Sequence, residues 1–175
     1  MSTHQSIQPV DSPANFNAVI PFVIAGFGDT SLSLAITTTD KGLAGIDYVH
    51  GLPAHKPLDK LAKEVVRQLE NYYGDPQWHF DLPLDLAGTS FQQRLWRALN
   101  KVPVGTTDTY GQLACQLNSG AQAVGQACRR NPVPVVVPCH RIVSLQGMGG
   151  YAGEVDGEKM SIKRALLTHE GYSGD

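Results

Sequence analysis

Residues 109–130 read TYGQLACQLNSGAQAVGQACRR, and this stretch decides the architecture of the second half of the chain. Its apolar spacing predicts a short helix over residues 110–117 and another over residues 120–130, with only Asn118 and Ser119 between them. Two short helices joined by so brief a turn are typical of a helix-turn-helix. The second half is therefore predicted to be mainly helical.

Three capping boxes, each a Ser or Thr followed three residues later by Gln, mark helix starts in this half. The pairs are Thr89 with Gln92, Thr109 with Gln112, and Ser119 with Gln122. The first pair opens a helix that ends before Pro103 and Gly105. A last helix is predicted over residues 158–170, and Gly171 stops it.

The second helix of the helix-turn-helix combines small residues with one polar stripe. Ala123 and Gly125 make it thin, whereas Gln122, Gln126 and Arg129 recur along one face at helical spacing. A thin helix of this kind can approach a groove of nucleic acid closely. The same pattern also fits a small-residue helix packed tightly on its neighbours, so both interpretations stay open.

Apolar patterning before residue 88 predicts three strands and one helix. The strands are expected over residues 18–25, 31–37 and 42–49, and an amphipathic helix over residues 57–73. The domain boundary is placed close to Gly88, where the sign of the charge changes. The chain then divides into a flexible tail (1–17), a small α/β domain (18–87) and a helical domain (88–175).

The composition is that of a soluble globular protein. The 175 residues are 42% hydrophobic and 17% charged, which excludes collagen, coiled coil and disorder. No apolar run approaches the roughly 20 residues that span a bilayer, and the N-terminus has no signal-peptide pattern. We expect a cytoplasmic protein that does not enter membranes, with its three cysteines as reduced thiols.

The net charge of −2 hides an uneven distribution. Residues 1–85 hold 5 Lys and Arg against 10 Asp and Glu, a net charge of −5, whereas residues 86–175 hold 9 against 6, a net charge of +3. The basic half is the one expected to meet a polyanion. Scattered surface charge without a ligand explains the same numbers equally well.

Residues 131–143 read NPVPVVVPCHRIV. The three prolines exclude a helix, and the valine run predicts a short buried extended segment that carries Cys139 and His140 at its end. Neighbouring cations favour the reactive thiolate. An inert buried cysteine is the alternative, and it is the interpretation adopted for Cys115 and Cys128, which are expected on apolar helix faces.

Zinc binding is the other common use of Cys and His. The chain has no Cys-x-x-Cys spacing, and the adjacent side chains of Cys139 and His140 diverge in an extended chain. We therefore predict no metal site. The same divergence means that a bridging water or a turn must connect the two residues if His140 acts as a base for Cys139.

Glu170 falls at the C-terminal end of the last predicted helix, where the helix dipole disfavours a carboxylate by about 0.3–1 kcal/mol. A partner such as His140 would compensate this cost. The result would be a relay of orienter, base and nucleophile that runs from Glu170 through His140 to Cys139. A frayed, solvated helix end is the alternative.

The segment PCHRIV (138–143), preceded by NPVP (131–134), closely resembles the active-site signature of the O6-alkylguanine-DNA alkyltransferases, or methylated-DNA–protein-cysteine methyltransferases. The resemblance extends through GTSFQQRLWRAL (88–99) and YGQLA (110–114) to HEG (169–171), and more loosely to the N-terminal domain. It implies an α/β N-terminal domain similar to ribonuclease H. It also implies a mainly α C-terminal domain with a winged helix-like helix-turn-helix.

The resemblance implies DNA repair by direct reversal. The alkyl group moves irreversibly from guanine O6, and also from thymine O4, in double-stranded DNA onto Cys139. Each molecule then acts once, as a monomer bound in the minor groove, and needs no cofactor. The target base must first leave the stack, because the alkyl carbon is out of reach inside the duplex.

The family also implies roles for individual residues. The expected catalytic residues are Cys139 as nucleophile, His140 as base through a water, Glu170 as orienter, Tyr110 as proton donor to guanine N3, and Asn131, which connects the helix-turn-helix to the active-site turn. The expected DNA contacts are Tyr110, Gln122, Ala123, Gly125, Gln126 and Arg129. The expected base pocket is lined by Val143, Tyr151 and Ala152, and Arg141 is expected to be structural.

Three features depart from the family pattern. Gln122 stands where the family commonly has an arginine that fills the gap left by the extruded base, so we expect weaker extrusion. Ala152 replaces the serine of some members. Glu154 and the extra residues up to Met160 predict an altered loop beside the pocket, which leaves the preferred size of the alkyl group open.

Two rival functions stay open for this sequence. A recognition module would bind alkylated bases without repairing them, although such relatives replace the cysteine that is present here. A thiol hydrolase would use Cys139 and His140 on a small substrate. A hydrolase would turn over, whereas a self-alkylating protein is consumed.

Overall fold

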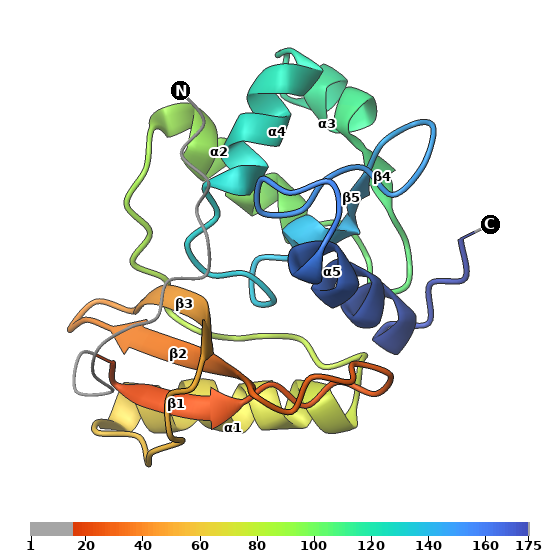
Figure 1. Ribbon diagram of the computed structural model, residues 1–175. Helices are drawn as coiled ribbons and strands as arrows, with labels where there is room; N and C mark the ends of the chain where they lie inside the picture. Colours follow the sequence, from red (N-terminus) through yellow and green to blue (C-terminus); the bar gives the residue numbers. More distant parts are fainter. Residues whose placement is uncertain (1–15, 175) are drawn as a thin grey trace. The chain divides into compact units, whose positions relative to one another are not determined.

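The computed structural model describes residues 16–174, so that residues 1–15, with most of the predicted tail, and residue 175 lie outside the described part. The chain forms two compact units, Met1–Ala87 and Gly88–Asp175. Strands and helices both occur, and the fold is mixed α/β (Figure 1). Among the described helices, none is long and apolar enough to cross a membrane.

A three-stranded antiparallel sheet forms the basis of the first unit. Strand β2 (Leu32–Thr38) lies between β1 (Ala18–Pro21) and β3 (Leu43–His50). Helix α1 (Lys60–Gly74) packs on one face of this sheet and buries residues such as Val65 and Leu69 (Figure 1). The three strands and the helix that the sequence predicts are therefore present.

Two boundaries in this unit differ from the prediction by more than one residue. The first strand ends at Pro21 rather than at residue 25, because the chain turns at Gly26, whose φ is 85°. The helix begins at Lys60 rather than at residue 57. Asp59 caps it there by accepting a hydrogen bond from the amide of Ala62 at 2.8 Å.

The second unit is mainly helical in its described residues. Its helices are α2 (Ser90–Leu99), α3 (Tyr110–Gln116), α4 (Ala121–Arg129) and α5 (Glu158–His169), and η2 (Cys139–Arg141) is a single 3-10 turn. Strand β4 (Asp108–Thr109) pairs in parallel with β5 (Ile142–Val143). Helix α4 packs against both α2 and α3, while α5 packs against η2.

Two of the three predicted capping boxes are confirmed. At α2, the Thr89 hydroxyl accepts a hydrogen bond from the amide of Gln92, and the Gln92 side chain accepts one from the amide of Thr89. Thr109 and Gln112 form the same pair of bonds at α3. Each box satisfies amide groups that the first helical turn leaves without a partner.

The third predicted capping box is wrong. Gly120 is the N-cap of α4 and makes no side-chain hydrogen bond. Ser119 still belongs to the preceding turn, in which Asn118 has a φ of 53° and the Ser119 amide donates to the carbonyl of Ala114 at 2.9 Å. The Ser-x-x-Gln pattern therefore begins one residue too early to cap the helix.

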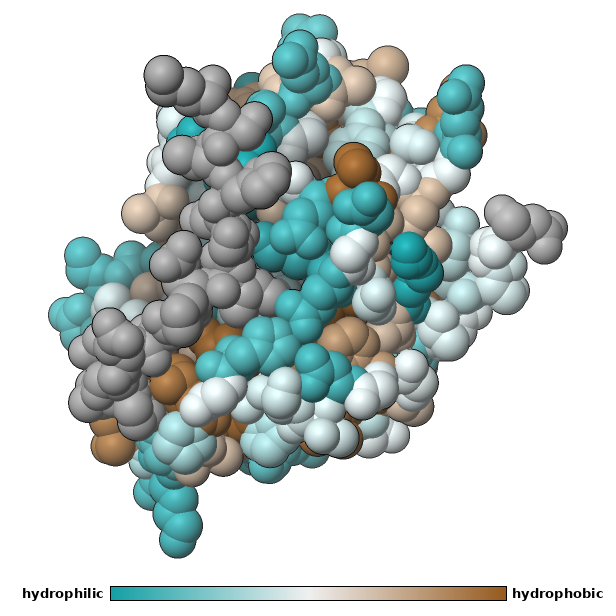
Figure 2. All heavy atoms as spheres, viewed as in Figure 1, coloured by the Kyte–Doolittle hydropathy of each residue, from teal (hydrophilic) through white to brown (hydrophobic). Residues whose placement is uncertain are grey.

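Hydrophilic residues predominate on the face of the molecule shown in Figure 2. Within residues 16–174, five large hydrophobic side chains are exposed: Val23, Leu58, Leu84, Leu145 and Val155. Leu145 and Val155, with 88% and 80% of their surface exposed, lie on two loops of the second unit. Neither side chain contributes to the hydrophobic core.

Candidate active site

The proline-rich segment before Cys139 is a tight turn, not the extended segment that the sequence predicts. Val135 has a φ of 72°, and the amide of Val137 donates to the carbonyl of Val133 at 3.0 Å. Prolines exclude a helix but do not impose extension, and the turn buries all three of these valines. A β-branched residue at positive φ is rare, so the surrounding core must hold this conformation in place.

Cys139, His140 and Arg141 form η2 directly after this turn. Their side chains point in directions about 120° apart, because a 3-10 helix has about three residues per turn. Cys139 is 7% exposed and His140 is fully buried. The thiol and the imidazole therefore diverge, as the sequence predicts, although on a helical rather than an extended backbone.

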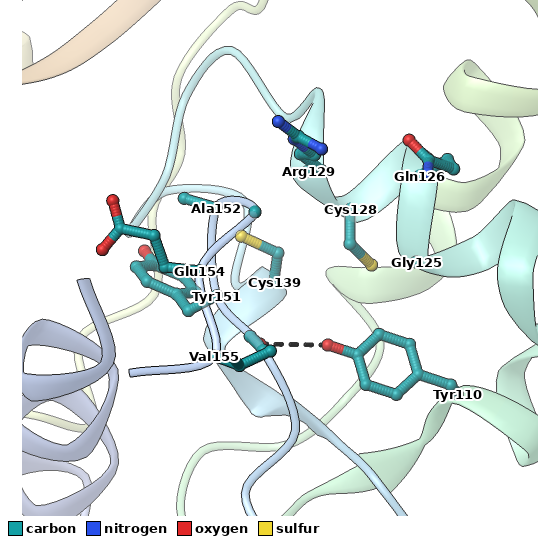
Figure 3. A pocket seen from close by; sticks show the side chains of 12 residues that line it. Tyr110, Gly125, Gln126, Cys128, Arg129, Cys139, Tyr151, Ala152, Glu154 and Val155 are labelled. Atoms are coloured by element: carbon teal, nitrogen blue, oxygen red, sulfur yellow. Dashed lines mark hydrogen bonds between the residues drawn. The ribbon is translucent and has the colours of Figure 1, made fainter. Parts of the chain in front are cut away.

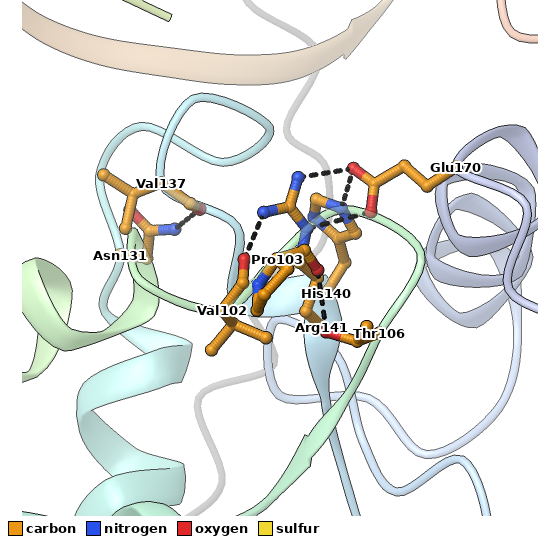
Figure 4. A network of polar contacts seen from close by, with 8 residues as sticks. All are labelled: Val102, Pro103, Thr106, Asn131, Val137, His140, Arg141 and Glu170. Carbon is orange, nitrogen blue, oxygen red and sulfur yellow. Dashed lines mark hydrogen bonds and ion pairs between the residues drawn. The ribbon is translucent and has the colours of Figure 1, made fainter. Parts of the chain in front are cut away.

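Figure 4 shows that one carboxylate, that of Glu170, joins both residues that follow Cys139. Nε2 of His140 lies 2.8 Å from Oε1 of Glu170. Nε and Nη2 of Arg141 donate to Oε2 and Oε1, each at 2.9 Å, and Nη1 donates to the carbonyl of Val102 at 2.7 Å. The pairing of His140 with Glu170 follows the relay that the sequence suggests, and Arg141 binds the same carboxylate.

The charges in this buried network leave His140 neutral. Burial raises the pKa of Glu170, but hydrogen bonds and positive charge from His140 and Arg141 outweigh it and lower that pKa to about 2. Burial lowers the pKa of His140. Because Arg141 already balances Glu170, His140 donates its Nε2–H to the carboxylate and keeps Nδ1 as the basic nitrogen. Nδ1 is buried without a hydrogen-bond partner among the described residues.

Asn131 holds the thiol of Cys139 in place. Its Nδ2 donates to Sγ at 3.2 Å and to the carbonyl of Val137 at 2.7 Å, while its Oδ1 accepts from the amide of Val133 at 3.0 Å. Burial raises the pKa of the Cys139 thiol, and the Asn131 hydrogen bond and the charge of Lys163 oppose that effect. The resting thiol is protonated at neutral pH, so a base must take its proton before it reacts.

A cavity of about 230 Å³ opens beside Cys139 (Figure 3). Six residues that the sequence assigned to DNA or to the base pocket line it: Tyr110, Gly125, Gln126, Arg129, Tyr151 and Ala152. Pockets for drug-sized ligands begin at roughly 300 Å³, so this smaller cavity suits a single base better. Tyr110 donates to the carbonyl of Gly150 at 3.1 Å, and burial raises the pKa of Tyr110, so the phenol keeps its proton.

Some predicted positions lie away from this cavity. Gln122 and Ala123 are exposed at the start of α4, and Val143 is buried in β5; none of the three lines the cavity. Cys128 is buried as predicted but lines the cavity together with Cys139. Cys115 is exposed, so its predicted place on an apolar face is wrong.

Lys163 on α5 is a residue of the site that the sequence analysis missed. Its side chain is fully buried, and its Nζ donates to the carbonyls of Ile142 at 2.6 Å, Met148 at 2.7 Å and Gly150 at 3.0 Å. In the described part of the chain no carboxylate pairs with it. Burial lowers the pKa of Lys163 to about 8, although the thiol of Cys139 opposes that shift.

The carbonyl of Gly150 links Lys163 to the cavity, because it accepts hydrogen bonds from both Lys163 and Tyr110. A sequence signal for this lysine existed. Lys163 follows Met160 by three residues and precedes Leu167 by four, so it lies on the apolar face of α5, where a lysine is unusual.

Residues 90–172 match the family model described as 6-O-methylguanine DNA methyltransferase, DNA binding domain. The chain is 39% identical over 133 residues to the methylated-DNA–protein-cysteine methyltransferase of Archaeoglobus fulgidus, covering 74% of this chain and 87% of the relative. The constitutive methylated-DNA–protein-cysteine methyltransferase of Bacillus subtilis is 40% identical over 122 residues, covering 68% and 71%.

A solved structure is similar over both units. The crystal structure of Mycobacterium tuberculosis OGT in complex with DNA has a TM-score of 0.69 and 34% sequence identity. The match covers 87% of this chain and 90% of that chain.

Proposed function

The chain belongs to the methylated-DNA–protein-cysteine methyltransferases, and we propose that it repairs O6-alkylguanine in duplex DNA by transferring the alkyl group to its own Cys139. The reaction is a direct reversal, because it restores guanine without removing the base. Each molecule acts once, since the thioether formed on Cys139 is stable. Alkylated thymine O4 is a second substrate, and the reaction needs no metal ion or cofactor.

The observation that carries this proposal is the position of Cys139. A buried thiol lines a cavity of about 230 Å³, and the next residue in the chain is a buried histidine bonded to a buried carboxylate. Nucleophile, base and orienter are the three groups that covalent catalysis by a cysteine requires.

His140 is the base that accepts the proton of the Cys139 thiol. The free nitrogen, Nδ1, receives it through one bridging water, and Glu170 stabilises the imidazolium that forms. The thiolate then attacks the alkyl carbon in line. The new S–C bond forms as the C–O6 bond breaks, and its electron pair stays with the guanine.

Tyr110 supplies a proton to the departing guanine. Its phenol remains protonated because burial raises its pKa, and it lines the cavity that would hold the base. Donation to guanine N3 balances the negative charge that develops on the base. Asn131 keeps Sγ aligned during the attack through the hydrogen bond at 3.2 Å.

DNA binding is assigned to the second unit as a winged helix-like helix-turn-helix, with α4 in the minor groove and the first unit resembling ribonuclease H. The exposed stripe Gln122, Gln126 and Arg129 faces the DNA, and Gln122 fills the gap left by the extruded base. Phosphate contacts supply most of the affinity, which should therefore fall as salt rises. The protein acts as a monomer in the cytoplasm.

The test compares repair with consumption of the protein. Duplex DNA bearing O6-methylguanine is given in excess, and the restored guanine is counted against the protein present. We expect one guanine restored per molecule, no repair by Cys139→Ala, and normal repair by Cys128→Ala, which removes the other thiol of the cavity.

Other outcomes would favour the rival functions. Lesion-specific binding without repair by the wild-type protein would indicate a recognition module. Repair that continues beyond one equivalent would indicate a turnover enzyme of the hydrolase kind. If the protein neither binds nor repairs the alkylated duplex, the whole proposal is wrong.

A further inference from the structure

The loop after Met148 holds a rigid turn beside Cys139. Tyr151 and Glu154 exchange two backbone hydrogen bonds of 2.8 and 2.9 Å, and the two residues between them, Ala152 and Gly153, both have positive φ, of 49° and 89°. These are the features of a type I′ turn. Two hydrogen bonds therefore hold the backbone from Tyr151 to Glu154 in this turn.

Contacts on several sides hold this turn. The carbonyl of Gly150 accepts from Lys163 and Tyr110. Gly153 lies so close under Arg129 that a Cβ added to it would be 2.5 Å from Nε. None of these contacts involves the side chain of Val155.

Val155 comes directly after the turn and lines the cavity with Cys139 (Figure 3), yet 80% of its surface is exposed. Its Cγ1 lies over Gly150, since a Cβ added there would be 3.8 Å from it. Of the five exposed large hydrophobic residues in the described chain, only Val155 lines this cavity. Because Val155 lies on the cavity itself, its apolar side chain is within reach of a molecule bound beside Cys139.

We propose that Val155 is a specificity-determining residue, which contacts the part of a large alkyl group that extends beyond the carbon attacked by Cys139. This inference rests on the proposed alkyl transfer. The carbon that reacts must lie against Sγ, and a methyl group ends there. A benzyl group has further apolar atoms, which would cover the side chain of Val155 and remove both surfaces from water.

The test measures single-turnover transfer from duplexes that carry either O6-methylguanine or O6-benzylguanine. Val155→Ser is expected to slow benzyl transfer by about tenfold, which is the smallest effect typical of losing an apolar contact in a specificity pocket. Methyl transfer should slow by less than about twofold. Val155→Ile should keep the wild-type ratio of the two rates. Serine carries no charge, so the change does not alter the attraction for DNA.

Leu145→Ser is the matched control, because Leu145 is 88% exposed but does not line the cavity. It should leave both rates unchanged. If Val155→Ser slows both substrates equally, or neither, Val155 does not select the alkyl group and the inference is wrong. The proposed function would fail differently, since the wild-type protein would then not demethylate the O6-methylguanine duplex at all.

Discussion

Lys163 offers the sharpest test of how the site is held together, through the substitution Lys163→Met. Methionine fills a similar volume but removes the ammonium group that binds three backbone carbonyls. It also removes the positive charge that favours the thiolate of Cys139. The variant should therefore change both the pH dependence of stability and the rate of alkyl transfer.

The pKa of Lys163 gives the size of the stability effect. It falls from the ordinary value of 10.5 to about 8 in the folded protein, and a difference of this size corresponds to about 3 kcal/mol. Between these two pH values the unfolded chain holds the proton that the folded protein has lost, so the free energy of unfolding rises with pH. From pH 7 to pH 10.5, the free energy of unfolding of the wild-type protein should therefore rise by about 3 kcal/mol more than that of Lys163→Met.

At pH 7 the two proteins should have similar stability. The variant leaves buried carbonyls without their amine partner, at about 1–3 kcal/mol for each that finds no other donor. The variant also no longer has to bury the Lys163 ammonium group, and the free energy saved in this way is of similar size. The transfer rate should nevertheless fall by about tenfold for each unit by which the pKa of Cys139 rises without the cation.

Urea unfolding followed by tryptophan fluorescence, at several pH values from 7 to 10.5, measures the first effect, and single-turnover transfer measures the second. Arg164→Met is the control, because it removes a positive charge from the same helix at the next residue, which is exposed. The other thiols and phenols titrate in both proteins and cancel in the difference. Parallel stability curves together with a wild-type transfer rate in Lys163→Met would refute this account of Lys163.

Three further substitutions test separate parts of the site. Glu170→Gln should lower the free energy of unfolding at pH 7 by about 3–5 kcal/mol, because Arg141 loses its buried partner. Since the pKa of Glu170 is about 2 against an ordinary 4.5, the wild-type protein, but not the variant, should lose about 3 kcal/mol of unfolding free energy as the pH falls from 4.5 to 2. Urea titrations that show the same loss in both proteins would contradict the ion pair of Glu170 with Arg141. Ala152→Gly should raise the free energy of unfolding by about 1 kcal/mol, because alanine is strained at a φ of 49°. A lower melting temperature than that of the wild-type protein would contradict this strain. Asn131→Ala should slow transfer by about tenfold through the loss of one hydrogen bond to the thiol, and an unchanged single-turnover rate would exclude an aligning role.

Local signals in the sequence explain what was predictable about the fold. The capping boxes at Thr89 and Thr109 are satisfied within a single helical turn, so they are formed as predicted. The box at Ser119 fails because the C-terminal turn of α3 still includes this residue: Asn118 has a positive φ, and the Ser119 amide donates to the carbonyl of Ala114, so α4 begins one residue later. A capping pattern was therefore confirmed where no other turn uses its first residue, and was wrong where the end of the preceding helix does.

At the site, the reacting groups were predictable, but the backbone that holds them was not. Cys139, His140 and Glu170 could be chosen from their chemistry, from the helix end at Glu170 and from the family resemblance. The turn at Val135 could not, because a valine at a φ of 72° contradicts its local preference and exists only through burial. Lys163 was overlooked because a lysine is normally exposed, and only the structure shows three carbonyls converging on it.

Peptide mapping of the methylated protein tests the central claim most directly. Cleavage after Lys and Arg places Cys139 alone in the peptide 131–141, whereas Cys115 and Cys128 share the peptide 102–129. After reaction with one equivalent of duplex DNA bearing O6-methylguanine, we predict a gain of one methylene on the peptide 131–141 and none on 102–129. A methyl group on 102–129, or on neither peptide once guanine has been restored, would contradict the assignment of Cys139 as the acceptor.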